Sequence, residues 1–194
     1  MSHGKSLTKD FIYKRIAQSI EVKEKTLAKN ADVVIKMAEV MIQALKQHKK
    51  MIFFGNGGSA ADSQHIAAEF IGRFQKERKS LPAIALTTDT SILTALGNDY
   101  GFDIVFARQL QGLGQRGDVA VAISTSGNSR NVIEAVKQAK KIGMKTLGFT
   151  GGDGGKLAPL CDLTLIVKSS VTARIQESHI CFFHILCEMV EEAV

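Results

Sequence analysis

The sequence predicts an α/β fold in which helices cover both faces of a central parallel sheet. After residue 50, short apolar runs alternate with amphipathic segments of helix length. Such alternation is typical of βαβ units, whose crossover helices pack on the sheet. The length of 194 residues suits a single domain with a substantial core, taken here as residues 1–194.

The first fifty residues are expected to form a helical segment ahead of the α/β core of residues 51–194. Apolar residues at Ile35, Ala38, Ile42 and Leu45 keep the spacing of one helical face. We expect two long helices here, before any strand. Because these helices have apolar faces but no sheet yet to cover, we expect them to pack against another subunit.

Five apolar runs are expected to form the strands, and the longer segments between and after them the helices. The strands are Met51–Phe54, Pro82–Leu86, Val119–Ile123, Thr146–Phe149 and Leu163–Val167. The helices are Ser59–Phe74, Asp103–Leu113, Ser129–Ile142 and Thr172–Ala193. In an open parallel sheet, ligands bind beyond the carboxyl ends of the strands, so the loops at those ends are the candidate site.

Composition excludes several classes of function. The net charge is +6, but many basic residues stand singly along expected helices, and there is no Trp and only two Tyr. We therefore expect no nucleic-acid partner, since single-stranded binders interleave basic and aromatic residues. Positive charge instead helps to attract anionic small molecules such as sugar phosphates.

The compartment is expected to be the cytoplasm. No apolar run approaches the ~20 residues that span a bilayer, so we expect no membrane association, and MSHGKSLTKDF lacks the apolar core of a secretory signal. The three cysteines, Cys161, Cys181 and Cys187, are odd in number and form no CxxC pair. Reduced thiols are expected rather than a disulfide framework or a thiolate zinc site.

Two strand-end loops are candidates for ligand binding. The first, GNGGSAADSQH at 55–65, lacks the spacing and the lysine of a Walker A motif, and its glycines alone are a weak signal. The second, STSGNS at 124–129, offers four hydroxyls immediately before a helix start, where free N–H groups favour a phosphate. Helix capping by Asn128 or Ser129 is the simpler alternative, but it explains only one hydroxyl.

Four side chains on two helices are of the types that bind metals or move protons. His65 and Glu69 are four residues apart and share one helical face. Gln176 and His184 are eight apart, roughly 12 Å along a helix axis, so they converge only if long side chains lean together. Because His184 lies among apolar neighbours, a buried core histidine remains an equal alternative, and His179 is given no role.

Together these motifs resemble one enzyme family. GNGGSAADSQH with Glu69, TDTSILTALGNDYGF at 88–102, STSGNS, and TARIQESH at 172–179 followed by His184 resemble the phosphoheptose isomerases of the sugar isomerase (SIS) fold. The resemblance covers almost the whole chain. It implies a flavodoxin-like sheet of five parallel strands and a homotetramer.

The resemblance also implies roles for individual residues. It implies one zinc ion per subunit, held by His65, Glu69, Gln176 and His184, with Glu69 as the base and His184 as the group that shuttles a proton. Substrate contacts would come from Asn56, Gly57, Gly58, Glu69, Asn98 and Asp99 (these two in a GND turn), Ser124, Thr125, Ser126, Ser129 and Gln176.

The implied reaction converts D-sedoheptulose 7-phosphate to D-glycero-D-manno-heptose 7-phosphate, the first step toward the heptose of bacterial lipopolysaccharide. Moving a carbonyl from C2 to C1 requires a proton to leave one carbon and return to its neighbour, which explains a carboxylate beside a second acid/base group. Some relatives carry an acid immediately before the RIQ motif, where this chain has Ala173.

Two alternatives remain on the same fold. One is a non-catalytic adaptor associated with the bacterial replication initiator, which is similar in its loops but does not retain Glu69 and His184. The other is an isomerase or sensor for a different sugar phosphate, which STSGNS alone fits equally well. Glu69 and His184 favour the phosphoheptose isomerase over the adaptor, and the metal-type set His65, Glu69, Gln176 and His184 favours it over the other sugar-phosphate protein.

Overall fold

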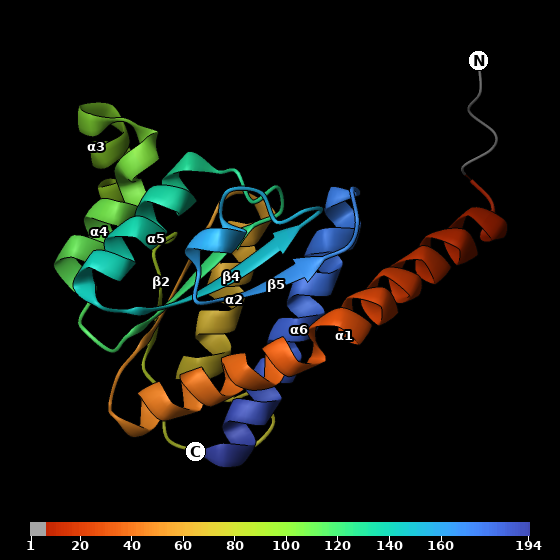
Figure 1. Cartoon of the computed structure of the whole chain (residues 1–194), viewed down its shortest axis with the longest axis horizontal. Coiled ribbons are helices and arrows are strands. Elements are labelled where there is room, and N and C mark those ends of the chain that lie inside the picture. Colours follow the sequence, from red (N-terminus) through yellow and green to blue (C-terminus); the bar gives the residue numbers. More distant parts are fainter. Residues whose placement is uncertain (1–6) are drawn as a thin grey trace.

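The computed structural model describes residues 7–194, which form a five-stranded parallel sheet between two layers of helix (Figure 1). The strands are β1 (Met51–Gly55), β2 (Ala83–Ala85), β3 (Val119–Ser124), β4 (Lys145–Gly151) and β5 (Leu163–Val167). Their order across the sheet is β2-β1-β3-β4-β5, and every pairing is parallel. The predicted fold class and all five strands are confirmed.

Six α-helices of the described residues surround this sheet. They are α1 (Lys9–Lys46), α2 (Gly58–Ile71), α3 (Thr90–Tyr100), α4 (Val105–Leu113), α5 (Arg130–Ile142) and α6 (Thr172–Ala193), with 3₁₀ turns η1 (Phe102–Ile104) and η2 (Ala158–Leu160). Alternate residues of β1 and β3 point to opposite faces. One face forms a core with α1, α2 and α6, and the other with α4 and α5.

The expectation of two leading helices was wrong, because α1 is one continuous helix of 38 residues. No Gly or Pro interrupts residues 9–46, so nothing breaks the helical hydrogen bonding. Its C-terminal half packs on the sheet and α6 through Val34, Met37 and Met41. Its N-terminal half runs past the sheet, as Figure 1 shows. Residues 1–6 of the expected helical segment lie outside the described residues.

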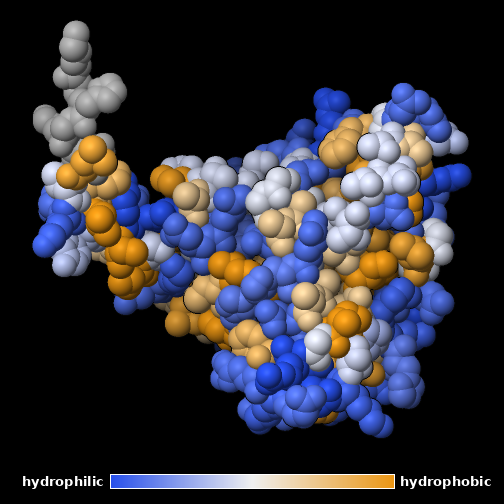
Figure 2. Space-filling view, turned by 180° about the vertical axis from the view of Figure 1, so that it is seen from behind, coloured by the Kyte–Doolittle hydropathy of each residue, from blue (hydrophilic) through white to orange (hydrophobic). Residues whose placement is uncertain are grey.

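The projecting half of α1 carries apolar side chains on its surface, visible as orange atoms along the projection in Figure 2. Those at least 39% exposed are Phe11, Ile12, Tyr13, Ile16, Ile20 and Leu27. This half of α1 thus presents an apolar side to solvent in the described chain.

Two further helix predictions need correction. The first helix of the core ends at Ile71 and not at Phe74, because the chain turns at Gly72. Helix α3 was not anticipated: it begins after Asp89, whose carboxylate accepts a hydrogen bond from the N–H of Ile92 (2.9 Å), yet none of its residues is buried. Asn98 and Asp99 therefore lie in a helix and not in a turn.

Candidate active site

The candidate site lies at the carboxyl ends of β1 and β3, which are neighbours in the sheet. The loops that follow them are tied together by a reciprocal pair of amide hydrogen bonds between Asn56 and Asn131, each 2.8 Å long. Asn56 was expected to contact substrate, and here its amide holds the first loop against the start of α5. Asn131 was missed, because its partner is 75 residues away in sequence.

Helices α2 and α6 form the first half of the site, a seam in which they run side by side in the same direction. At one end of the seam, a Cβ atom on Gly58 would lie 2.3 Å from the Gln176 amide nitrogen, so only glycine permits this approach. Seven residues further along α2, His65 meets His184 of α6. Gln176 and His184, eight residues apart on α6, therefore contact α2 at two points that are seven residues apart.

His65, Glu69 and His184 converge in this seam. The Nε2 atoms of His65 and His184 are 3.0 Å apart, and the same His65 nitrogen is 3.3 Å from Glu69 Oε1. The Glu69 side chain is 24% exposed, so it can be reached from solvent. His65 Nε2 is thus close enough to share a proton with either the His184 imidazole or the Glu69 carboxylate. His184 is therefore not an isolated core histidine.

The seam can be tested for its fit to zinc. Two ligands of one tetrahedral zinc ion lie ~3.3 Å apart at ordinary Zn–N and Zn–O distances. The two separations at His65 Nε2 match this value, and the donor types are ones that zinc accepts. Within residues 7–194, however, no group of three or more His, Cys, Asp or Glu is arranged closely enough to hold a metal ion. The fit therefore rests on these two pairwise distances, because the Gln176 amide lies at the other end of the seam, against Gly58.

Three other groups shape the seam. The Phe74 ring lies 5.5 Å from the His184 ring, centroid to centroid. Burial and the charge of Glu69 raise the pKa of the Cys187 thiol to about 12, so this cysteine is no nucleophile near neutral pH. Burial also raises the pKa of Asp62 to about 6, against the opposing effect of His65. Asp62 was missed, although its position three residues before His65 places it on the same helical face.

The STSGNS loop forms the second half of the site, which we call the cradle. Ser124 and Ser129 bring their hydroxyl oxygens within 3.0 Å of each other, and Ser126 Oγ accepts a hydrogen bond from the N–H of Asn128 (3.1 Å). Ser129 occupies the N-cap position of α5, yet its side chain makes no capping hydrogen bond within the described chain. The capping alternative therefore does not account for Ser129.

A cavity of about 210 Å³ opens beside the cradle. Thr125 and Ser126 line it together with parts of the chain that sequence reasoning did not connect: Gly151, Gly152, Asp153, Ser169, Ser170, Thr172 and Ile175. A Cβ atom on Gly127 would lie 2.1 Å from the carbonyl oxygen of Gly154, which packs the cradle against the loop after β4. Thr172 and Ile175 belong to the first turn of α6, directly before Gln176. The cavity thus extends from the cradle to the start of α6, next to Gln176 in sequence.

Two predicted residues are not brought to this site. Asn98 and Asp99 are exposed near the end of α3, where the Asn98 amide donates a hydrogen bond to the Asp99 carboxylate (2.8 Å). In the described chain, neither makes a hydrogen bond or ion pair with any other predicted site residue. Figure 1 shows α3 at the far edge of the molecule from α6.

His179, which was given no role in the sequence analysis, contacts β4 and not the seam. It is fully buried, and its Nε2 atom lies 3.0 Å from the carbonyl oxygen of Thr150 on β4. Burial lowers its pKa to about 4, although the hydrogen bond to Thr150 works in the other direction. A neutral imidazole therefore connects α6 to the strand that leads into the cradle cavity.

Comparison with known proteins defines the class. A sequence profile of the SIS domain matches residues 15–151, a range that contains the sheet from β1 to β4 and both loops of the site. The phosphoheptose isomerase of Nitratiruptor sp. is 61% identical over 154 residues, which cover 79% of this chain and 82% of the relative. That of Aquifex aeolicus is 55% identical over 183 residues, which cover 94% of this chain and 96% of the relative.

A solved structure agrees with this assignment. The phosphoheptose isomerase of Neisseria gonorrhoeae superimposes with a TM-score of 0.90 at 47% identity, covering 95% of this chain and 98% of the other. The chain belongs to the phosphoheptose isomerases of the SIS-domain family, and the resemblance drawn from its motifs is confirmed.

None of the described helices is both long and apolar enough to cross a membrane.

Proposed function

We propose that this chain is an isomerase that converts D-sedoheptulose 7-phosphate to D-glycero-D-manno-heptose 7-phosphate, at the start of the route to the heptose of lipopolysaccharide. The observation that carries the proposal is the convergence of Glu69, His65 and His184 in the α2–α6 seam. An aldose–ketose isomerisation needs a general base and a second acid/base group that substrate can reach, and a solvent-accessible carboxylate beside an imidazole supplies both.

The chemistry follows from the two halves of the site. The cradle would bind the phosphate through the hydroxyls of Ser124, Thr125, Ser126 and Ser129 and the N-terminus of α5, leaving the carbonyl end of the sugar toward the seam. The Glu69 carboxylate would take a proton from C1, giving an enediol, and return it to C2. His184 would carry the accompanying proton between O2 and O1, so that no proton is gained or lost overall.

A zinc ion is proposed as the cofactor, held by His65, Glu69, Gln176 and His184. When bound, it would polarise the substrate carbonyl and stabilise negative charge on the oxygens of the reacting carbons. Gln176 is the unusual ligand, since zinc sites mostly use His, Cys and carboxylate.

The test is turnover of sedoheptulose 7-phosphate by purified protein as isolated, after chelation and after zinc is added back. We expect activity that falls on chelation and returns with zinc. Full activity after complete removal of metal would contradict the zinc proposal alone. No conversion under any of the three conditions would contradict the proposed reaction and favour the adaptor or another sugar phosphate.

A homotetramer is also proposed, assembled through the exposed apolar side of α1. Ile12, Ile16 and Ile20 are 62%, 57% and 52% exposed, and burying them between copies removes apolar surface from water. We expect Ile16→Glu to lower the mass measured by light scattering, and Lys36→Glu, on the exposed side of the packed half of α1, to leave it unchanged. An unaltered mass in Ile16→Glu would contradict this interface.

The cytoplasm is proposed as the compartment. The three cysteines are all free thiols, which suits a reducing environment.

A further inference from the structure

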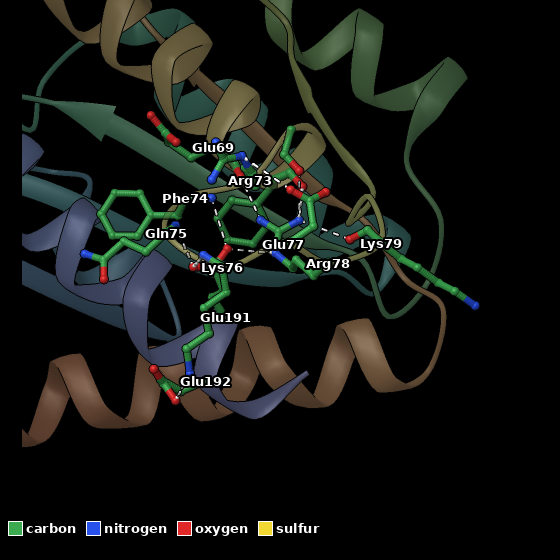
Figure 3. Close-up of polar contacts among 12 residues, drawn as sticks. Glu69, Arg73, Phe74, Gln75, Lys76, Glu77, Arg78, Lys79, Glu191 and Glu192 are labelled. Atoms are coloured by element: carbon green, nitrogen blue, oxygen red, sulfur yellow. Dashed lines mark hydrogen bonds and ion pairs between the residues drawn. The ribbon is translucent and has the colours of Figure 1, made fainter.

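The loop that follows α2 is folded around a buried carboxylate from the other end of the chain. Three successive backbone N–H groups, those of Phe74, Gln75 and Lys76, donate to the Glu191 carboxylate at 3.0, 2.7 and 2.8 Å (Figure 3). Glu191 lies near the end of α6 and is 6% exposed. Consecutive N–H groups that converge on one anion fix the loop conformation strongly.

Arg78 completes this arrangement and reaches the active-site helix. Its Nε atom forms a 3.1 Å ion pair with Glu191 Oε1, as Figure 3 also shows. Its Nη atoms donate to the carbonyl oxygens of Glu69 (2.7 Å), Phe70 (2.9 Å) and Gly72 (3.2 Å). These carbonyls lie at the C-terminus of α2, where they lack helical partners. Arg78 therefore caps the turn of α2 that carries Glu69.

Glu191 keeps its charge in this environment. Burial raises the pKa of its carboxyl group, but the three N–H donors and the Arg78 guanidinium outweigh burial, and the pKa is lowered overall. Removing the carboxylate would leave three N–H groups and a guanidinium without their acceptor. This would cost free energy, because the Arg78 side chain is only 11% exposed and water cannot fully replace the lost partner.

The same loop contacts both members of the acid/base pair. Through Arg78 it holds the backbone of Glu69, and through Phe74 it places an aromatic ring at an angle of 31° against His184. Capping α2 alone would require only Arg78. The three bonds from residues 74–76 to Glu191 have the further effect of setting the backbone position of Phe74.

We propose that Glu191 is a positioning residue of the isomerase, which holds the 74–78 loop so that Phe74 fixes the His184 ring and Arg78 fixes the turn bearing Glu69. The inference rests on the proposed function of the seam. Misplacing catalytic groups by about 1 Å can lower rates by roughly 100-fold, so an indirect contact of this kind can control turnover.

The decisive variant is Glu191→Gln, with Glu192→Gln as its matched control. Glu192 is the next residue, but its side chain is 59% exposed and pairs only with Lys76 at 2.5 Å among the described ion pairs. For Glu191→Gln we expect kcat to fall about 10- to 100-fold with KM within about threefold, because the cradle lies on other elements. For Glu192→Gln we expect both constants within about twofold.

Phe74→Leu provides a second test that does not disturb the Glu191 carboxylate, because the hydrogen bond of residue 74 comes from its backbone. We expect kcat to fall about tenfold, and the double variant Phe74→Leu/Glu191→Gln to lose less than the product of the two single losses, since both act on His184. If Glu191→Gln does not fold, Phe74→Leu decides alone.

The outcomes separate this inference from the proposed function. An active parent enzyme with equal kcat in Glu191→Gln and Glu192→Gln would overturn the inference only, as would a loss confined to KM or an unchanged kcat in Phe74→Leu. A parent without isomerase activity would overturn the proposed function and the inference with it.

Discussion

The two halves of the site are built in different ways. The seam consists of titratable side chains, His65, Glu69 and His184, on two helices that pack along each other. The cradle consists of hydroxyls and backbone groups at strand ends, around Ser124–Ser129 and the loop after β4. Each half is supported by a different set of contacts.

The difference matches what each half must do. Proton transfer tolerates little displacement, and helices held by packing and by Arg78 and Glu191 keep their side chains in place. A phosphate is held by many weak donors, and N–H groups at a helix start supply them without any one being essential. Changes in the seam should therefore lower kcat, and changes in the cradle should raise KM.

Glu69→Gln should have the largest effect, because it removes the base while keeping the shape of the side chain. We expect kcat to fall by about 10³-fold or more, with substrate affinity largely retained. Single-turnover kinetics and calorimetric binding of sedoheptulose 7-phosphate measure the two quantities separately. If binding is lost together with turnover, Glu69 is not acting mainly as the base.

Gly58→Ala should follow, since the added Cβ would meet the Gln176 amide at 2.3 Å and push this side chain out of the seam. We expect a fall in kcat of about 10- to 100-fold. Gly112→Ala in α4 is the control, because a Cβ there meets nothing within 4 Å. Equal kcat values in the two variants would mean that the position of the Gln176 side chain does not affect turnover.

Ser126→Ala should have a smaller effect of the opposite kind. We expect KM to rise about tenfold and kcat to stay within about threefold, because one of several phosphate contacts is lost. Ser80→Ala, in an exposed loop outside the cradle, serves as the control. An unchanged KM would show that the Ser126 hydroxyl serves only the loop itself, through its bond to Asn128.

His179→Gln should affect activity least and stability in a pH-dependent way. Because the folded pKa of His179 is about 4, below the ordinary 6.5, its contribution to stability is present at neutral pH and is lost as pH falls from about 6.5 to 4. Between pH 7 and 4.5 this loss amounts to about 2 kcal/mol, which the variant should not show.

Urea unfolding of both proteins at the two pH values measures the difference. The same change in the free energy of unfolding in both would mean that His179 is not held neutral by its burial between α6 and β4.

Much of the fold could be predicted because its signals are local. Each strand is a short apolar run and each long helix an amphipathic one, and all five strands were located to within a few residues. Helix α3 was not predicted because none of its residues is fully buried, and Leu93 and Leu96, which pack against the core, are only partly covered. The continuity of α1 follows from the absence of Gly and Pro between residues 9 and 46.

By itself, the sequence determined the strand–helix alternation, the family, and the residue types of the site, because these depend on spacing along the chain and on motifs that stay contiguous. Only the tertiary structure decided which of these residues meet. Asn131 beside Asn56, Gln176 against Gly58, and Glu191 within the 74–76 loop join positions 75 to 118 residues apart. No local pattern encodes such contacts, since they arise from the packing of helices on a shared sheet.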